Sequence, residues 1–258
     1  MVRGIEIFKT YFSGYPENYL IIGGTACDII INEAGFTPRA TKDIDLILIV
    51  EALTPDFVKQ FWKFIQDGNY ERKEKSADHR RYYRFTNPEN KEFPLQIELF
   101  SRPPDIIELD EDAHITPIPV DDDLSSLSAI LLSDDYYHFM REHSKDENGL
   151  RRANTEALIC LKAKAVLEIT ERIANGSKED SKQIKKHKAD VFRLAIMFTE
   201  DDFFEIPGSI KAHMQEFANA VSNDLPDGAI FKEMGLGTVD VKKVFNQVVK
   251  NFNLTVNE

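Results

Sequence analysis

A short stretch between residues 19 and 50 restricts the fold of this chain more than any other. An apolar run ends at Gly23 and Gly24, followed by Thr25 and a helix-length segment, and then Asp43 and Asp45 open a second apolar run. Residues i and i+2 of a strand project from the same face, so the two aspartates point the same way. Because adjacent carboxylates repel each other, the pattern predicts that a cation binds between them.

The residue types in this stretch suit phosphate chemistry. Mg²⁺ prefers carboxylate oxygens and leaves coordination positions open for phosphate. A Gly-Gly turn lets backbone N–H groups approach a phosphate, and the N-terminus of the following helix favours the anion. We therefore expect phosphoryl or nucleotidyl transfer, with Gly23, Gly24 and Thr25 holding the outer phosphates. The alternative is structural: the glycines form only a tight turn, and Asp43 and Asp45 form only a solvated strand edge.

The combined pattern resembles that of the nucleotidyltransferase superfamily, which has Gly-Gly or Gly-Ser, a helix, and then Asp-x-Asp. The segment Arg39-Ala40-Thr41-Lys42-Asp43-Ile44-Asp45-Leu46 is most similar to the AbiEii/AbiGii-type proteins of abortive-infection and toxin–antitoxin systems. The resemblance implies an α+β fold: a nucleotidyltransferase-type small mixed sheet with flanking helices, followed by a C-terminal helical bundle. It also implies Mg²⁺ (or Mn²⁺) as cofactor and a nucleoside triphosphate (NTP) as substrate.

A third carboxylate, Glu98, lies in a later apolar segment. Residues 79–86 and 93–100 predict a β-hairpin, and Glu98 alternates with apolar residues in its second strand. A charged residue is rarely buried without a partner. The resemblance implies that Glu98 joins Asp43 and Asp45 as a metal ligand. The alternative is that Glu98 pairs with Arg81 or Arg84 across the hairpin.

Two helical segments extend the resemblance. Lys162 begins a Lys-x-x-Ala pattern, and in the later segment the basic residue Lys188 stands shortly before Asp190, with Leu194 after it. The resemblance implies that Lys162 binds nucleotide phosphate and that Asp190 is a catalytic carboxylate. Where the family often has a second acid, this chain has Arg193. The alternative is a helix-surface ion pair of Asp190 with Lys186 or Arg193, at spacings of four and three residues.

Hydrophobic periodicity and turn residues predict the remaining elements. We expect strands at 19–22 and 44–50, and helices at 5–12, 25–33, 54–68, 155–174, 181–199, 208–221 and 239–252. Residues 126–132 and 136–140 suggest another hairpin, and residues 145–149 a loop. We expect two domains, a nucleotidyltransferase-like α/β domain over residues 1–148 and a helical domain over residues 149–258 that closes the active-site cleft.

Composition restricts location and partners. No apolar run is long enough to cross a membrane, and the first residues lack a signal-peptide core. The two cysteines, Cys27 and Cys160, lie in expected helices, where we expect them to be small core residues of a protein in a reducing compartment. We therefore expect a cytoplasmic protein with no membrane partner. The net charge of −12 argues against non-specific nucleic-acid binding, although a lysine-rich segment at 182–188 forms either a solvated face or a contact for RNA phosphates.

Nucleotidyl transfer is therefore the leading hypothesis. The acceptor is a hydroxyl on RNA, a protein or a small molecule, and the chain is a candidate toxin with tRNA or a cognate antitoxin as candidate partners. One alternative is a non-catalytic nucleotide- or partner-binding protein that retains the fold. The other is an antibiotic-type enzyme in which the acidic residues of segment 105–135 face a cationic small molecule.

Overall fold

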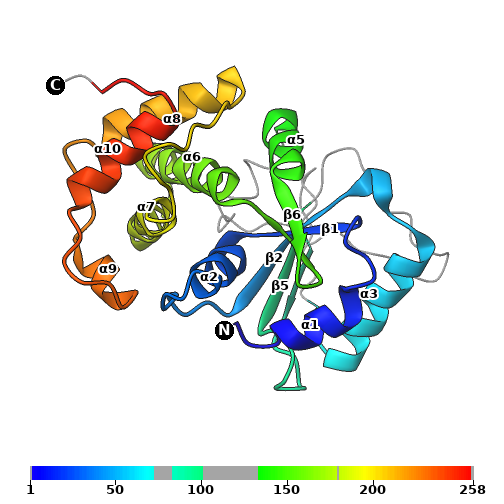
Figure 1. The fold of residues 1–258 in the computed structure, drawn as a ribbon. Coiled ribbons are helices and arrows are strands. Elements are labelled where there is room, and N and C mark those ends of the chain that lie inside the picture. The colour runs from blue at the N-terminus through cyan, green and yellow to red at the C-terminus, as the bar shows by residue number, and fades with distance from the viewer. Residues whose placement is uncertain (1, 73–82, 101–132, 179, 257–258) are drawn as a thin grey trace.

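A mixed β-sheet with helices on both sides forms the centre of the molecule (Figure 1). The computed structural model describes residues 2–72, 83–100, 133–178 and 180–256. Within these ranges the sheet has seven strands in the order β3-β4-β5-β2-β1-β7-β6. Further helices pack together toward the C-terminus. This confirms the expected fold class, an α+β arrangement of a mixed sheet, flanking helices and a C-terminal helical bundle.

The strands place β2 next to both β1 and β5. Their bounds are β1 Tyr19–Ile22, β2 Asp43–Leu48, β3 Glu71–Arg72, β4 Tyr83–Thr86, β5 Gln96–Phe100, β6 Ser144–Glu147 and β7 Leu150–Ala153. β2 runs antiparallel to β1 and parallel to β5, while β1 runs parallel to β7. All four residues of β1 are buried, as expected for a strand that is covered on both faces.

The helices divide between the two faces of the sheet. They are α1 Ile5–Phe12, α2 Gly23–Glu33, α3 Pro55–Gly68, α5 Asp134–Glu142, α6 Thr155–Ala174, α7 Lys182–Ala195, α8 Gly208–Val221, α9 Ala229–Glu233 and α10 Val241–Asn251. In Figure 1, α1 and α3 lie on one side of the sheet and α2 on the other. α2 also contacts α6 and α7, so it connects the sheet to the C-terminal helices.

Aromatic side chains fill the space between the sheet and the α1–α3 pair. Phe8 and Phe12 of α1 meet Phe64 of α3 with ring centroids 5.9 and 5.2 Å apart, and Tyr19 of β1 packs against Phe8 at 5.4 Å. Burial of each such ring stabilises the fold by roughly 1.5–3 kcal/mol. α3 begins where the Thr54 hydroxyl accepts a hydrogen bond from a backbone N–H of its first turn, which caps the N-terminus of the helix.

Two local predictions were wrong. Residues 136–140 belong to helix α5 rather than to a strand, because their buried residues follow helical spacing. Residues 145–149 are not a loop: they lie in the β6–β7 hairpin, whose turn residues Asn148 and Gly149 have φ of 55° and 75°. β6 is polar because it is an edge strand. The hairpin expected over 79–86 and 93–100 is confirmed for β4 and β5; residues 79–82 and 126–132 lie outside the described residues.

The β6–β7 hairpin bears on the expected domain boundary. The sheet continues to Ala153, and the C-terminal helices begin at Thr155, so residue 149 lies within a hairpin of the sheet.

The expected bounds of α6 and α8 are confirmed. Cys27 and Cys160 are both buried and free. No helix in the described ranges combines the length and apolarity that crossing a membrane requires.

Candidate functional site

The turn from β1 to α2 is shaped by close contacts that only glycine allows. Gly23 has φ +66°, and a Cβ there would lie 1.8 Å from Oδ2 of Asp45. A Cβ on Gly24 would lie 2.7 Å from the Thr41 hydroxyl and 3.2 Å from Nη2 of Arg39. Gly23 and Gly24 form a glycine turn. Because they lack side chains, a carboxylate and a guanidinium can approach this turn from neighbouring positions.

Thr25 fixes this turn to the start of β2. Its side chain is fully buried, and its hydroxyl donates a hydrogen bond of 2.5 Å to the backbone carbonyl of Asp43. The sequence pattern suggested that Thr25 holds phosphate, and the structure places its hydroxyl on the protein backbone instead. The contact makes Thr25 a structural link between the glycine turn and the aspartate pair.

The carboxylates of β2 and β5 form an acidic cluster, defined here as Asp43, Asp45 and Glu98. Asp45 lies opposite Glu98 on β5, and Asp43 lies opposite Gln96. On its other side Asp45 pairs with Ile22 of β1, which explains its contact with the glycine turn. The sheet register thus brings together the three acids that the sequence predicted as metal ligands.

Glu98 also has the structural partner that the alternative interpretation predicted. Nε of Arg84, opposite Glu98 on β4, lies 2.8 Å from its Oε1. The Gln96 amide donates a hydrogen bond of 2.6 Å to the same oxygen. Among the described residues, Oε2 of Glu98 has no hydrogen-bond or ion-pair partner, so one oxygen is held and the other is available to a ligand.

The electrostatics of the acidic cluster favour a cation. Burial, together with the carboxylates of Glu98 and Asp43, raises the pKa of Asp45 to about 8. Burial also raises the pKa of Glu98, and Asp43 adds to the shift despite the opposing effect of Arg84. With a pKa of about 8, Asp45 holds its proton at neutral pH because too little positive charge lies beside it. A divalent cation would supply that charge.

The donor set of the acidic cluster fits Mg²⁺, although the three side chains do not form a ready-made cage. No group of three or more His, Cys, Asp and Glu side chains in the described part of the chain is arranged to hold an ion. Mg²⁺ usually takes only one or two carboxylates and completes its coordination with water and substrate phosphates. Asp43 and Asp45, which share one face of β2, meet that requirement, with the free oxygen of Glu98 nearby.

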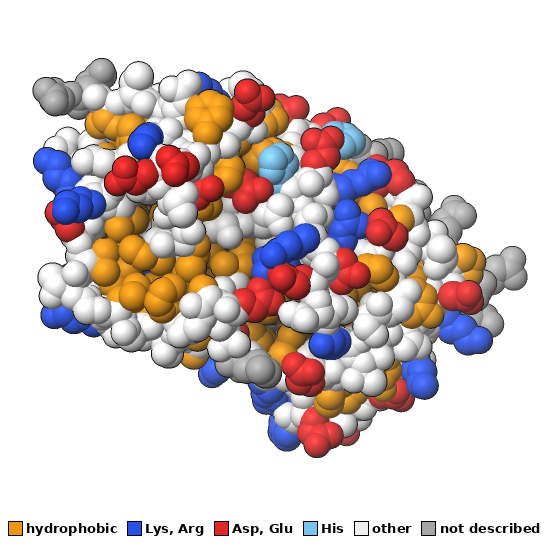
Figure 2. Space-filling view, in the orientation of Figure 1, with side chains coloured by type: hydrophobic (Ala, Val, Ile, Leu, Met, Phe, Trp, Pro, Cys, Tyr) orange, Lys and Arg blue, Asp and Glu red, His pale blue; other side chains and the backbone are white. Residues whose placement is uncertain are grey.

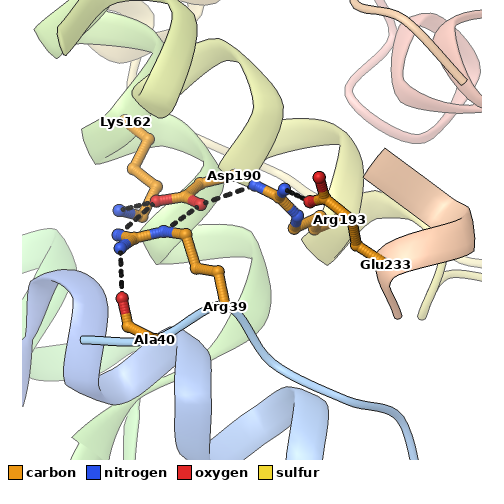
Figure 3. A network of polar contacts seen from close by, with 6 residues as sticks. All are labelled: Arg39, Ala40, Lys162, Asp190, Arg193 and Glu233. Atoms are coloured by element: carbon orange, nitrogen blue, oxygen red, sulfur yellow. Dashed lines mark hydrogen bonds and ion pairs between the residues drawn. The ribbon is translucent and has the colours of Figure 1, made fainter. Parts of the chain in front are cut away.

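Asp190 lies in a second charged group, the Asp190 network, which consists of Arg39, Lys162, Asp190, Arg193 and Glu233 (Figure 3). Its Oδ1 accepts from Nε of Arg39 at 2.8 Å and its Oδ2 from Nη2 at 3.0 Å. Oδ2 also accepts from Nζ of Lys162 at 2.9 Å, and Oδ1 from Nη1 of Arg193 at 3.4 Å. Arg193 in turn pairs with Glu233 at 2.7 Å. Both carboxylate oxygens of Asp190 are therefore used twice.

Burial and charge give this network an electrostatic character opposite to that of the acidic cluster. Asp190 and Lys162 are 2% and 1% exposed. Burial alone would raise the pKa of Asp190, but Lys162 and Arg39 outweigh that effect and hold it well below its usual range. Of the partners that the structural alternative named for Asp190, Arg193 makes the expected contact, but in a buried site rather than on a helix surface.

The two charged groups are neighbours. Arg39 contacts Asp190 and also lies against Gly24, and Gly23 lies against Asp45. Lys162 is close enough to Asp45 to lower its pKa. The structure thus brings together the glycine turn, the aspartate pair and the two helical residues that the resemblance implied.

Two basic residues have a larger part in the site than the sequence indicated, where Arg39 could be either structural or phosphate-facing and Lys186 either a partner of Asp190 or part of a lysine-rich face. Arg39 links the two charged groups, and its only sequence signal was its place in the motif before Asp43. Lys186 lies near the acidic cluster, where its charge acts on both Asp45 and Glu98. Partial burial of its ammonium group and the nearby cations lower the pKa of Lys186. Within the described ranges it makes no ion pair, and its signal was the lysine-rich segment.

Comparisons with known proteins give only distant likenesses. No protein-family model matches the sequence, and no curated protein matches it. Among solved structures, the chain is similar to an antigenic nucleotidyltransferase-like protein from Paracoccidioides brasiliensis, with a TM-score of 0.42 and 16% identity over 89% of this chain and 99% of that one. It is also similar to the Megavirus polyadenylate synthase, with a TM-score of 0.39 and 14% identity over 85% of this chain and 36% of that one. Similarity this low carries no functional argument.

Proposed function

We propose that the chain is a Mg²⁺-dependent nucleotidyltransferase that transfers a nucleoside monophosphate from an NTP to a hydroxyl group. The observation that carries the proposal is the acidic cluster beside the glycine turn. Asp45 lies directly against Gly23 at the start of α2. A carboxylate pair that lacks positive charge, next to backbone N–H groups at a helix N-terminus, suits a metal-bound phosphate chain.

Each group has a definite task in this proposal. Asp43 and Asp45 hold the metal ion, with the free oxygen of Glu98 as a third ligand. When bound, Mg²⁺ neutralises phosphate charge and orients the phosphate chain. The N–H groups of Gly23 and Gly24 face the outer phosphates, and Lys186 supplies positive charge that favours the leaving pyrophosphate. Thr25 keeps the turn and the aspartates in register.

The acceptor and the biological role belong to the same proposal. The resemblance of segment 39–46 to AbiEii/AbiGii-type proteins supports a toxin whose acceptor is an RNA or a protein, with tRNA and a cognate antitoxin as candidate partners. The antibiotic-type alternative relies on segment 105–135, of which residues 105–132 lie outside the described residues. In Figure 2 the charged side chains on the visible face include both signs, so that face shows no broad basic surface for nucleic acid.

One observation favours a second candidate function, nucleotide binding without transfer. Both oxygens of Asp190 are occupied by cations of the protein. A carboxylate in that state is a poor general base, because its pKa is too low to accept a proton near neutral pH. If no other group activates the acceptor hydroxyl, the site binds the NTP and its metal but transfers nothing.

The experiment that separates these functions is a labelling reaction. Purified protein is incubated with each α-³²P-labelled NTP, Mg²⁺ and, in separate reactions, total RNA, total protein or an aminoglycoside mixture. We expect label in one acceptor fraction, and its loss in Asp45→Asn. Asp201→Asn, which alters an exposed aspartate, is the matched control. Metal-dependent NTP binding without label in any fraction would favour the non-catalytic function.

A further inference from the structure

Arg39 is held in one orientation by Asp190. It lies in the segment between α2 and β2, and its guanidinium meets the carboxylate through two parallel hydrogen bonds of 2.8 and 3.0 Å. Such a planar, bidentate contact fixes both the position and the tilt of a guanidinium. Asp190 is itself fixed by Lys162 and Arg193, so the support behind Arg39 is rigid.

This orientation places the guanidinium at the glycine turn. Nη2 of Arg39 lies 3.2 Å from the position that a Gly24 Cβ would occupy. The adjacent Gly23 contacts Asp45 of the acidic cluster. A phosphate chain bound to a metal at Asp43 and Asp45 would therefore extend past the Arg39 side chain.

Arg39 also keeps hydrogen-bond donors available. A guanidinium has five N–H groups. Two of them donate to Asp190, and one on Nη1 donates to the backbone carbonyl of Ala40 at 3.4 Å. The remaining two have no partner among the described residues. The side chain is 22% exposed, so a ligand can reach it.

Lys162 and Asp190 differ from Arg39 in this respect. Their side chains are 1% and 2% exposed, and they contact each other. A phosphate could reach Lys162 only if the Asp190 contact were broken. The Asp190 network contains three cations and two carboxylates, counting Arg39, Lys162 and Arg193 against Asp190 and Glu233. Its surplus positive charge is accessible at Arg39.

We propose that Arg39 contacts the phosphate chain of the nucleotide and that Asp190 is its positioning residue, with Lys162 holding Asp190 in place. This inference rests on the proposed function, because it names the phosphate contact of the same site. It gives Lys162 and Asp190 a task through Arg39, where the resemblance implied direct contact with the nucleotide.

The test is a double-mutant cycle on anion binding, which does not depend on transfer activity. Calorimetry measures the binding of inorganic tripolyphosphate and of each NTP, with Mg²⁺, to wild type, Arg39→Ala, Asp190→Asn and the double variant. We expect Arg39→Ala to weaken binding about tenfold or more, the scale of losing a charge-assisted hydrogen bond. Asp190→Asn should weaken it as well, and the double variant should bind no more weakly than Arg39→Ala. Arg141→Ala, at a partly exposed arginine that pairs with Glu51, is the matched control.

The outcomes separate the inference from the proposed function. The inference would be overturned if the losses of binding affinity in Arg39→Ala and Asp190→Asn multiply in the double variant. It would also be overturned if Arg39→Ala binds as tightly as wild type. If Asp190→Asn does not fold, the variant Arg39→Lys takes its place, because lysine keeps the charge but cannot form the bidentate contact. A several-fold loss of phosphate affinity in Arg39→Lys, with an unchanged melting temperature, supports the inference. Full affinity in that variant overturns it. Wild type that binds neither tripolyphosphate nor any NTP would overturn both. Binding without transfer would overturn only the transferase function.

Discussion

The acidic cluster and the Asp190 network are two carboxylate centres joined through the glycine turn, yet their charge balance is opposite. Asp190 has three cations around one buried carboxylate, and its pKa lies well below the usual range. Asp45 has two carboxylate neighbours, and its pKa is raised to about 8. In the first centre the protein satisfies the charge itself. In the second the charge is left for a ligand.

This difference separates residues that build the site from residues that bind its ligand. A buried carboxylate whose oxygens are all occupied holds its neighbours in place, and removing it leaves buried cations unpaired. A carboxylate without compensating charge destabilises the fold until a cation arrives. In the proposed function, Asp190 and Lys162 therefore support the site, and Asp43 and Asp45 bind its metal.

The largest expected effect is on stability at the Asp190 network. Asp190→Asn should lower the free energy of unfolding by about 3–5 kcal/mol, because Lys162 then keeps a buried, uncompensated charge. Combining it with Lys162→Met should restore part of the loss. Urea denaturation measures both variants. A loss below about 1 kcal/mol would mean that Asp190 contributes no more than an ordinary surface ion pair. The contrast between the two carboxylate centres would then be wrong.

The next effect concerns the contact between Gly23 and Asp45. Gly23→Ala should lower the free energy of unfolding by about 1–3 kcal/mol, through its positive φ and through the clash with the carboxylate. Gly35→Ala is the matched control, since Gly35 has φ +81° and no atom within 4 Å of its Cβ position. In an Asp45→Gly background, which also removes the Asp45 Cβ that lies 3.1 Å from the added methyl position, the excess cost of Gly23→Ala over Gly35→Ala should disappear. An excess that persists there would mean that the carboxylate does not occupy the turn.

The third effect is a pH dependence of the stabilisation of the protein by Mg²⁺. Asp45 has a raised pKa in the fold, so the metal-free fold takes up a proton and loses stability as the pH rises from about 4 to about 8. Mg²⁺ must displace that proton, so its stabilisation of the protein should grow by up to about 1.4 kcal/mol per pH unit between pH 6 and 8. Melting temperatures with and without Mg²⁺ measure this. In Asp45→Asn the pH-dependent part should vanish, and a Mg²⁺ response that is equal at pH 6 and pH 8 in wild type would argue against Asp45 as a ligand.

The smallest effect is expected at the edge of the acidic cluster. Lys186→Ala should weaken NTP binding about three- to tenfold with little change in stability, because it removes a nearby cation that makes no ion pair. Raised salt should reduce the difference from wild type. Lys185→Ala, the exposed neighbour on α7, should be nearly silent. Equal effects of the two variants would show that only the general charge of α7 matters.

Most of the fold could be predicted from local sequence signals. The bounds of α6 could be predicted from Asn154 before the helix and the pair Asn175-Gly176 after it, although the Asn154 side chain makes no capping hydrogen bond in the structure. The β6–β7 hairpin was missed because an edge strand that is polar on both faces has the composition of a loop. The sequence of residues 136–140 predicts a strand where the structure has helix α5, because a short apolar run does not distinguish the two structures.

The candidate site was only partly predictable. The acids of β2 could be found because strand alternation places Asp43 and Asp45 on one face. Of the partners of Asp190, Arg193 could be predicted from its spacing of three residues. Arg39 could not, because it lies 151 residues away in sequence and no periodicity links the two. Glu98 had two interpretations, and the structure supports the structural one at one oxygen while leaving the other oxygen available.

The most direct test of the central claim is the divalent-cation dependence of NTP binding. Calorimetry of wild type with each NTP, in Mg²⁺ and in excess chelator, should show binding with Mg²⁺ and a loss of tenfold or more without it, since the acidic cluster then repels the triphosphate. The Asp43→Asn/Asp45→Asn variant should lose the Mg²⁺ dependence, whereas Asp201→Asn should keep it. Equal affinity of wild type for every NTP with and without Mg²⁺, or no binding in either, would contradict the assignment of the acidic cluster as a metal–nucleotide site.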